Sequence, residues 1–192
     1  MSNRVFRNRI LVAFGSNLAS ETATSAELLR EAQAQLERSG ATIRAASRLY
    51  HSPAFPPGNG PDYVNAAANL EANWTAVEAL RHLHAIEAMM GRKRGERWGR
   101  RTLDLDLLAV GDTVLPDAAT HRRWREMPLS EQVGKTPGEL ILPHPRMQDR
   151  AFVLVPLAEV APDWVHPLTG LTVRQMLDRL SEDDIDGVTA LE

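Results

Sequence analysis

The 192-residue sequence contains no cysteine, so neither disulfide bonds nor thiolate metal sites can contribute to its structure. Aromatic residues make up only 5% of the chain, and it lacks the run of exposed sheet aromatics with which many RNA-binding modules stack bases. No apolar stretch approaches the length of a membrane span, and the arginine-containing N-terminus lacks the apolar core of a signal peptide. We therefore expect a cytoplasmic protein without membrane or nucleic-acid partners.

The length is typical of a single domain, which we assign to residues 1–192 and expect to be a monomer. Residues 116–139 are polar and irregular in pattern, so we interpret them as an inserted surface loop that is dispensable for turnover. The acidic tail, residues 181–192, is expected to be frayed.

The most informative stretch of the chain runs from Arg97 to Leu108. From Leu103 to Leu108 every residue except two aspartates is leucine, a pattern that predicts a strand buried on both faces. Asp104 and Asp106 are two positions apart and therefore point the same way on a strand. Two neighbouring carboxylates repel each other, so a bound cation such as Mg²⁺, or ion pairs with arginines, must compensate their charge.

A basic loop leads directly into this strand. Six cationic residues lie within ten positions of the chain: Arg92, Lys93, Arg94, Arg97, Arg100 and Arg101. Guanidinium groups grip phosphate oxygens, and a metal ion bridges carboxylates to the same oxygens. The combination favours a site for a Mg-bound polyphosphate, and the alternative is a solvated or nucleic-acid-binding loop.

The order of the predicted elements is β-α-β-β-α-β. The expected strands are 9–14, 42–50, 62–70 and 103–108, and the expected helices are 21–38, capped by Ser20, and 76–90, capped by Thr75. Gly15 to Asn17 is interpreted as a turn. A short edge strand at 113–115 and further helices follow, one with Pro156 in its first turn and one capped by Thr172. This order indicates an α+β, ferredoxin-like fold with additional C-terminal helices on the sheet.

Five motifs of the chain are informative when they are taken together. The longest is Arg97-Trp98-Gly99-Arg100-Arg101-Thr102-Leu103-Asp104-Leu105-Asp106. The others are Phe14-Gly15-Ser16-Asn17-Leu18, Asp62-Tyr63-Val64-Asn65-Ala66-Ala67, Ile86-Glu87 with Gly91-Arg92, and Leu142-Pro143-His144-Pro145-Arg146-Met147. This set resembles one known family, the hydroxymethyl-dihydropterin pyrophosphokinases of folate biosynthesis, of which the longest motif is the signature. The motifs occur in the family's order and cover most of the chain from about residue 10 to residue 180.

The resemblance implies transfer of pyrophosphate from ATP to a reduced hydroxymethyl pterin, with two Mg²⁺ ions held by Asp104 and Asp106. The catalytic residues that it implies are Arg92, Arg101, Asp104 and Asp106. The implied ATP-binding residues are His84, Glu87, Arg92, Trp98, Arg101, His144 and Arg150. The implied pterin-binding residues are Ser52, Pro53, Phe55, Tyr63, Asn65 and Phe152.

Some positions depart from the family's pattern. The family usually has glutamine where this chain has His84, and Pro56, Arg100 and Pro145 also differ from common residues. Considered alone, Tyr63 and Asn65 fit either a flat heterocycle or an ordinary core. The alternatives to a pyrophosphokinase are a metal-dependent phosphoesterase that uses the same aspartates and an RNA-binding module on the same fold.

Overall fold

The computed structural model describes residues 7–17, 24–54, 61–91, 103–128, 131 and 135–191. The strands are β1 (Asn8–Ser16), β2 (Thr42–Ala46), β3 (Tyr50–Ser52), β4 (Tyr63–Ala72), β5 (Asp104–Val110) and β6 (Thr189–Ala190). The helices are α1 (Ser25–Arg38), α2 (Ala76–Met89), α3 (Ala118–Arg125), α5 (Ala151–Val160), α6 (Val173–Leu177) and α7 (Glu182–Asp186), with a 3₁₀ turn at Met147–Asp149. None of the helices in these ranges is long and apolar enough to cross a membrane.

The strands form one antiparallel sheet in the order β5-β1-β4-β3-β6, and β2 also pairs with β4. This order confirms the predicted ferredoxin-like arrangement, because β1 and β4 are the central strands and β5 lies next to β1. The single strand predicted at 42–50 is divided into β2 and β3, both of which pair with β4. Gly15 and Ser16 belong to β1, so the turn predicted there was wrong.

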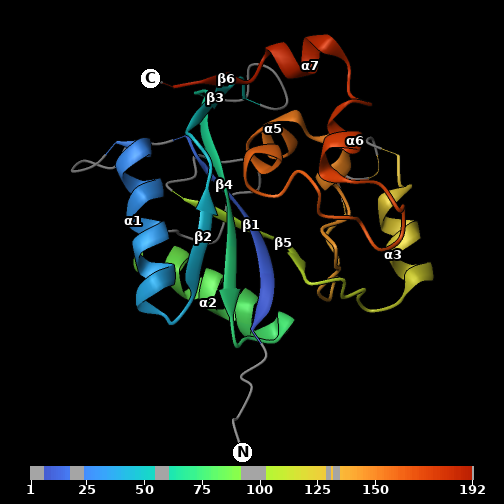
Figure 1. Ribbon diagram of the computed structural model, residues 1–192, viewed down its shortest axis with the longest axis horizontal. Helices are drawn as coiled ribbons and strands as arrows, with labels where there is room; N and C mark the ends of the chain where they lie inside the picture. Colours follow the sequence, from blue (N-terminus) through green and yellow to red (C-terminus); the bar gives the residue numbers. More distant parts are fainter. Residues whose placement is uncertain are drawn as a thin grey trace, which may run out of the picture.

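Two hydrophobic layers cover the two faces of the sheet (Figure 1). Helices α1 and α2 pack on one face, where Leu36 and Leu83 are almost completely buried. Helices α5 and α6 pack on the other face, where Leu154 and Met176 are equally buried. Leu105 and Leu107 point into the α2 layer, so the two aspartates between and before them point toward the α5 side.

Local capping signals correctly predicted the starts of α2 and α6. The capping boxes of α2, formed by Thr75 and Glu78, and of α6, formed by Thr172 and Gln175, are both present. The predicted start of the first helix was wrong, because Thr24 caps α1 at Ser25. Pro156 was also misplaced, since α5 begins at Ala151 and the proline lies inside it.

Two segments are more ordered than the sequence suggested. Residues 118–125 form α3, and His121 within it is fully buried, so the 116–139 segment is not merely an irregular surface loop. The tail is not frayed over its described length, because α7 is followed by β6, which pairs with β3. The edge strand predicted at 113–115 is reduced to an isolated bridge between Leu115 and Leu142.

Candidate active site

The floor of the candidate site is one end of the sheet on its α5 side. Gly15 of β1 lies between Asn65 of β4 and Asp104 of β5 in the strand register. Ala13 is likewise paired with Asp106. Residues paired across antiparallel strands share a face, so small residues of β1 separate the polar side chains of its two neighbours. A Cβ at Gly15 would already contact Asn65 and the ring of Tyr63.

Two cavities adjoin at this end of the sheet. The first, about 360 Å³ in volume, includes Ser52, Pro53, Tyr63, Asn65, Phe152 and Val153 among its lining residues. The second, about 630 Å³, includes Leu80, His84, Trp124, Lys135, Pro137 and Arg146. Five residues line both cavities: Asp104, Asp106, Thr136, His144 and Arg150. The half-buried aspartates therefore lie where the two cavities meet.

The walls of the first cavity are polar on the β3 side and aromatic on the α5 side. Asn65 donates a buried hydrogen bond of 2.8 Å from Nδ2 to Ser52 Oγ, which fixes the amide orientation. Phe152 lies on α5 with the Arg150 guanidinium 5.6 Å from its ring centre. The cavity thus combines aromatic rings from β4 and α5 with a fixed amide, a combination suited to a flat polar heterocycle.

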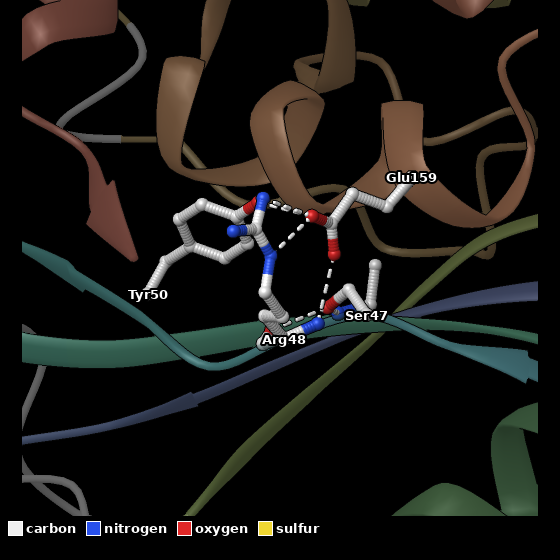
Figure 2. Close-up of polar contacts among 5 residues, drawn as sticks. Ser47, Arg48, Tyr50 and Glu159 are labelled. Atoms are coloured by element: carbon white, nitrogen blue, oxygen red, sulfur yellow. Dashed lines mark hydrogen bonds and ion pairs between the residues drawn. The ribbon is translucent and has the colours of Figure 1, made fainter. Parts of the chain in front are cut away.

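A hydrogen-bond network joins α5 to β3 and the residues just before it (Figure 2). Glu159 of α5 accepts hydrogen bonds from the Tyr50 hydroxyl (2.6 Å), the Arg48 backbone N–H (2.8 Å) and Arg48 Nε (2.7 Å). Burial raises the pKa of Glu159, but the bonds from Tyr50 and Arg48 outweigh this and lower it overall. Since Tyr50 begins β3 and Ser52 ends it, the network ties the Ser52 wall to the helix that carries Phe152.

Two groups outside the sheet hold the outer edge of β5. Glu87 is 1% exposed, and its Oε1 accepts the backbone N–H of Leu105 at 2.8 Å. The backbone N–H of His144 donates to the Leu108 carbonyl at 2.8 Å. An edge strand otherwise leaves such groups without a sheet partner, so both contacts fix the strand that carries the aspartates.

The His144 ring is held as a neutral donor. Its Nδ1 accepts the backbone N–H of Arg146 at 3.2 Å, so in the neutral ring the proton lies on Nε2. Burial, followed by the charges of Arg150 and Arg146, lowers the pKa of His144 to about 3. At neutral pH the ring therefore presents an N–H to the cavities, and a bound anion would favour its protonation.

The structure brings most of the predicted site residues together. Ser52, Pro53, Tyr63, Asn65, Asp104, Asp106, His144, Arg150 and Phe152 line the first cavity, and His84 lines the second. Phe55, Arg92, Trp98 and Arg101 lie outside the described residues. Glu87 is not among the described residues that line either cavity, its Oε1 accepts the backbone N–H of Leu105, and its contact with ATP stays a prediction.

Sequence reasoning missed several lining residues. Thr136 and Trp124 come from the polar 116–139 segment, whose composition gave no sign of a site. Arg146 lines the second cavity, and one of its terminal nitrogens is buried without a hydrogen-bond partner among the described residues. Its position directly after the Pro-His-Pro motif was the only available signal.

The donor set at the junction fits a weakly coordinated hard cation. Both aspartates offer oxygen ligands, which Mg²⁺ prefers. Within the described ranges, no cluster of three or more His, Asp or Glu side chains could form a complete cage. Mg²⁺ is usually held by one or two carboxylates, with substrate phosphates and waters as the remaining ligands, and the aspartate pair fits that role.

A family model described as 7,8-dihydro-6-hydroxymethylpterin-pyrophosphokinase (HPPK) matches residues 11–162. The chain belongs to this family. A relative from Synechocystis sp., named 2-amino-4-hydroxy-6-hydroxymethyldihydropteridine pyrophosphokinase, is 42% identical over 141 residues, which are 73% of this chain and 62% of the relative. A Pseudomonas aeruginosa protein of the same name is 40% identical over 81% of this chain and 82% of its own length. The description of the family and the names of both relatives specify a pyrophosphokinase.

Solved structures agree on the fold. A crystal structure of a Plasmodium falciparum HPPK-DHPS triple mutant has a TM-score of 0.69 with 13% sequence identity. The similarity covers 98% of this chain and 48% of the Plasmodium chain. At this identity the similarity supports the α+β fold, and the chain spans about half the length of that structure.

Proposed function

We propose that this protein transfers the pyrophosphoryl group of ATP to the hydroxymethyl group of 6-hydroxymethyl-7,8-dihydropterin. The products are the pterin diphosphate and AMP, and the step belongs to tetrahydrofolate biosynthesis. The observation that carries the proposal is the aspartate pair at the meeting point of two cavities of different character. A transfer between two substrates needs its charge-neutralising groups at that point.

The first cavity is assigned to the pterin. Tyr63 and Phe152 would stack on the ring, while Ser52 and Pro53 border it. Asn65 has one amide hydrogen committed to Ser52, which leaves its second hydrogen and its oxygen to read the amide edge of a pterin. The small residues of β1 leave room for the ring above the floor.

The second cavity is assigned to ATP. His144 and Arg150 would bind phosphates, and Arg146 is added because its buried guanidinium nitrogen has no partner within the described residues. His84 and Trp124 would border the nucleoside. Arg92, Trp98 and Arg101 lie outside the described residues and remain predicted ATP-binding residues, with the two arginines as phosphate ligands.

Asp104 and Asp106 would hold the two predicted Mg²⁺ ions. When bound, the ions supply neutralisation of phosphate charge and polarisation of the attacking hydroxyl. The other contribution to catalysis is the positioning of the substrates. The cavity walls would hold the pterin hydroxyl in line with the β-phosphorus, and the cationic side chains would bind the oxygens of the leaving AMP.

The identity of the nucleotide product tests this proposal. Purified protein with Mg²⁺, ATP and the reduced pterin should produce AMP and pterin diphosphate in equal amounts, as measured by anion-exchange chromatography. Without pterin, ATP should persist. Formation of ADP with the pterin would identify an ordinary kinase, and pterin-independent breakdown of ATP would identify a phosphoesterase.

We further propose that the chain acts as a single-domain monomer in the cytoplasm, without nucleic acid. Support for a single domain comes from the one sheet with a hydrophobic layer on each face, and support for the cytoplasm comes from the supply of ATP in that compartment. Sedimentation analysis at working concentration should give the 21.3 kDa mass of one chain. A stable dimer that loses activity on dilution would contradict the proposed monomer.

A further inference from the structure

We infer that His121, on α3 in the polar 116–139 segment, is a positioning residue for His144. The inference rests on the proposed phosphate-binding role of His144 and concerns a buried residue of α3, the helix that also carries Trp124 of the second cavity. His121 is fully buried, and its Nε2 lies 2.8 Å from the Pro143 carbonyl oxygen. Because a carbonyl oxygen only accepts, Nε2 of His121 carries the proton.

The peptide unit between Pro143 and His144 is therefore held at both of its polar ends. His121 donates to its carbonyl oxygen, and its N–H donates to the Leu108 carbonyl on β5 at 2.8 Å. The orientation of this peptide plane sets the direction in which the His144 side chain leaves the backbone. Loss of either bond would let the plane rotate and move the imidazole N–H relative to the cavities.

A second buried histidine supports the placement of His121. The rings of His121 and His166 lie edge to face with centroids 5.6 Å apart. Nδ1 of His166 accepts backbone N–H groups from Leu168 and Thr169 at 3.2 and 3.4 Å, so the proton lies on its Nε2. That atom and His121 Nδ1 are buried without partners in the described part of the chain. One is a donor and the other an acceptor, so the pair suits a shared water and does not suit a metal ion, which needs two lone pairs.

The charge state of His121 agrees with this role. Burial lowers the pKa of His121, the bond to Pro143 opposes that effect, and the charge of Arg125 adds to the lowering. The groups that face it are the Pro143 carbonyl, the His166 ring and the Arg125 guanidinium. A neutral ring that donates from Nε2 is therefore the stable form at neutral pH.

A double-mutant cycle with His144 tests the inference. His121→Phe keeps an aromatic ring but removes the donor, whereas His121→Gln keeps an N–H donor of similar reach. We expect His121→Phe to raise the KM for ATP about fivefold to tenfold, the effect of one lost hydrogen bond, with the pterin KM within about twofold of wild type. His121→Gln should recover most of this change, and Arg122→Ala, an exposed change on the same helix, should have no effect.

The cycle separates positioning from general destabilisation. In a His144→Ala background, His121→Phe should change the KM for ATP by less than about twofold, because the residue that it positions is gone. An equal effect in both backgrounds, or an equal rise in both KM values, would overturn the inference. If His121→Phe has no cooperative thermal transition, His121→Asn replaces it in the cycle. The side chain of asparagine is too short for its amide to donate to the Pro143 carbonyl oxygen.

A spectroscopic measurement keeps the inference distinct from the function proposed for His144. Should His144→Ala leave the KM for ATP unchanged, the phosphate-binding role of His144 would be wrong, whatever His121 does. The ¹⁵N signals of the His144 ring in the ligand-free protein would then decide the positioning role. They should move in His121→Phe and stay in place in His121→Gln, and unchanged signals in both variants would overturn the inference.

Discussion

Replacement of either aspartate at the junction by asparagine should nearly abolish turnover without unfolding the protein. Asp104→Asn and Asp106→Asn each keep the shape of the side chain and remove one ligand charge from the proposed metal site. Loss of one group that stabilises transition-state charge typically costs about 10²–10³-fold in rate, or about 2.7–4 kcal/mol in the barrier. We expect at least this loss in kcat for each variant.

The stability of these variants follows from the strand geometry. Residues two apart on a strand are separated by about 6.6 Å, and at that distance two carboxylates repel by about 0.6 kcal/mol in water and about 2.5 kcal/mol at an effective dielectric of 20. Both side chains are half-buried, so the true value lies between these limits. Each variant should therefore be as stable as wild type without metal, or more stable by about 1 kcal/mol.

Thermal melts with and without Mg-ATP distinguish the metal site from a set of ion pairs. At a ligand concentration of about 100 Kd, binding should stabilise wild type by about 2.7 kcal/mol, a shift of roughly 5–10 °C for a chain of this size. The variants should shift by less than half as much. Asp112→Asn, an exposed carboxylate just after β5 that lines neither cavity, should behave as wild type. Variants destabilised by about 3–5 kcal/mol with a normal response to Mg-ATP would refute the reasoning and favour ion pairs.

Three further predictions follow from the supports of the site. Glu87→Leu should lower the free energy of unfolding by about 1–3 kcal/mol in urea titrations, because the backbone N–H of Leu105 loses its acceptor. Glu87→Gln keeps an acceptor oxygen and should therefore retain most of the wild-type stability. Burial lowers the pKa of His166 to about 4, so between about pH 6.5 and 4 the unfolded chain binds a proton at His166 and the folded protein does not. As the pH falls through this range, His166 should therefore lower the free energy of unfolding by up to about 1.4 kcal/mol per pH unit. His166→Phe should remove this contribution. Replacement of residues 118–138 by a short Gly/Ser linker should raise the KM for ATP about tenfold, since Thr136 lines both cavities and His121 holds Pro143.

Each of these has a result that would contradict it. Equal stability of the Leu and Gln variants at position 87 would mean that the Leu105 bond contributes nothing. An unchanged pH dependence in His166→Phe would mean that His166 titrates normally in the folded protein. Wild-type ATP kinetics in the linker variant would restore the interpretation made from the sequence, in which the 116–139 segment is a dispensable surface loop.

The features that could be predicted from the sequence are those set by near neighbours in the chain. Asp104 and Asp106 point to one side because strand geometry alone decides it. The caps at Thr75 and Thr172 need only a partner three residues later, and both are present. The start of α1 was misjudged because Ser20 and Thr24 are both competent caps, and only the second is followed three residues later by a carboxylate that completes a capping box.

The features that could not be predicted depend on partners far along the chain. The strand expected at 42–50 is interrupted where Arg48 bonds to Glu159, 111 residues away. The burial of His121 depends on the Pro143 carbonyl, 22 residues away. The tail is ordered because β6 pairs with β3. No local pattern of hydrophobic residues encodes such contacts.

The two cavities are lined by different kinds of structure. This difference predicts how substitutions in each lining should affect the reaction. The first cavity is built on strand residues whose register fixes Asn65 and Asp104 on either side of β1. Much of the second cavity is lined by irregular segments, 135–141 and 144–146, joined to the sheet by a few hydrogen bonds such as that from His144 to Leu108. The aspartates belong to the sheet, so changes in the irregular segments should leave them in place. Such changes should therefore raise the KM for ATP while the barrier for bound substrates changes little.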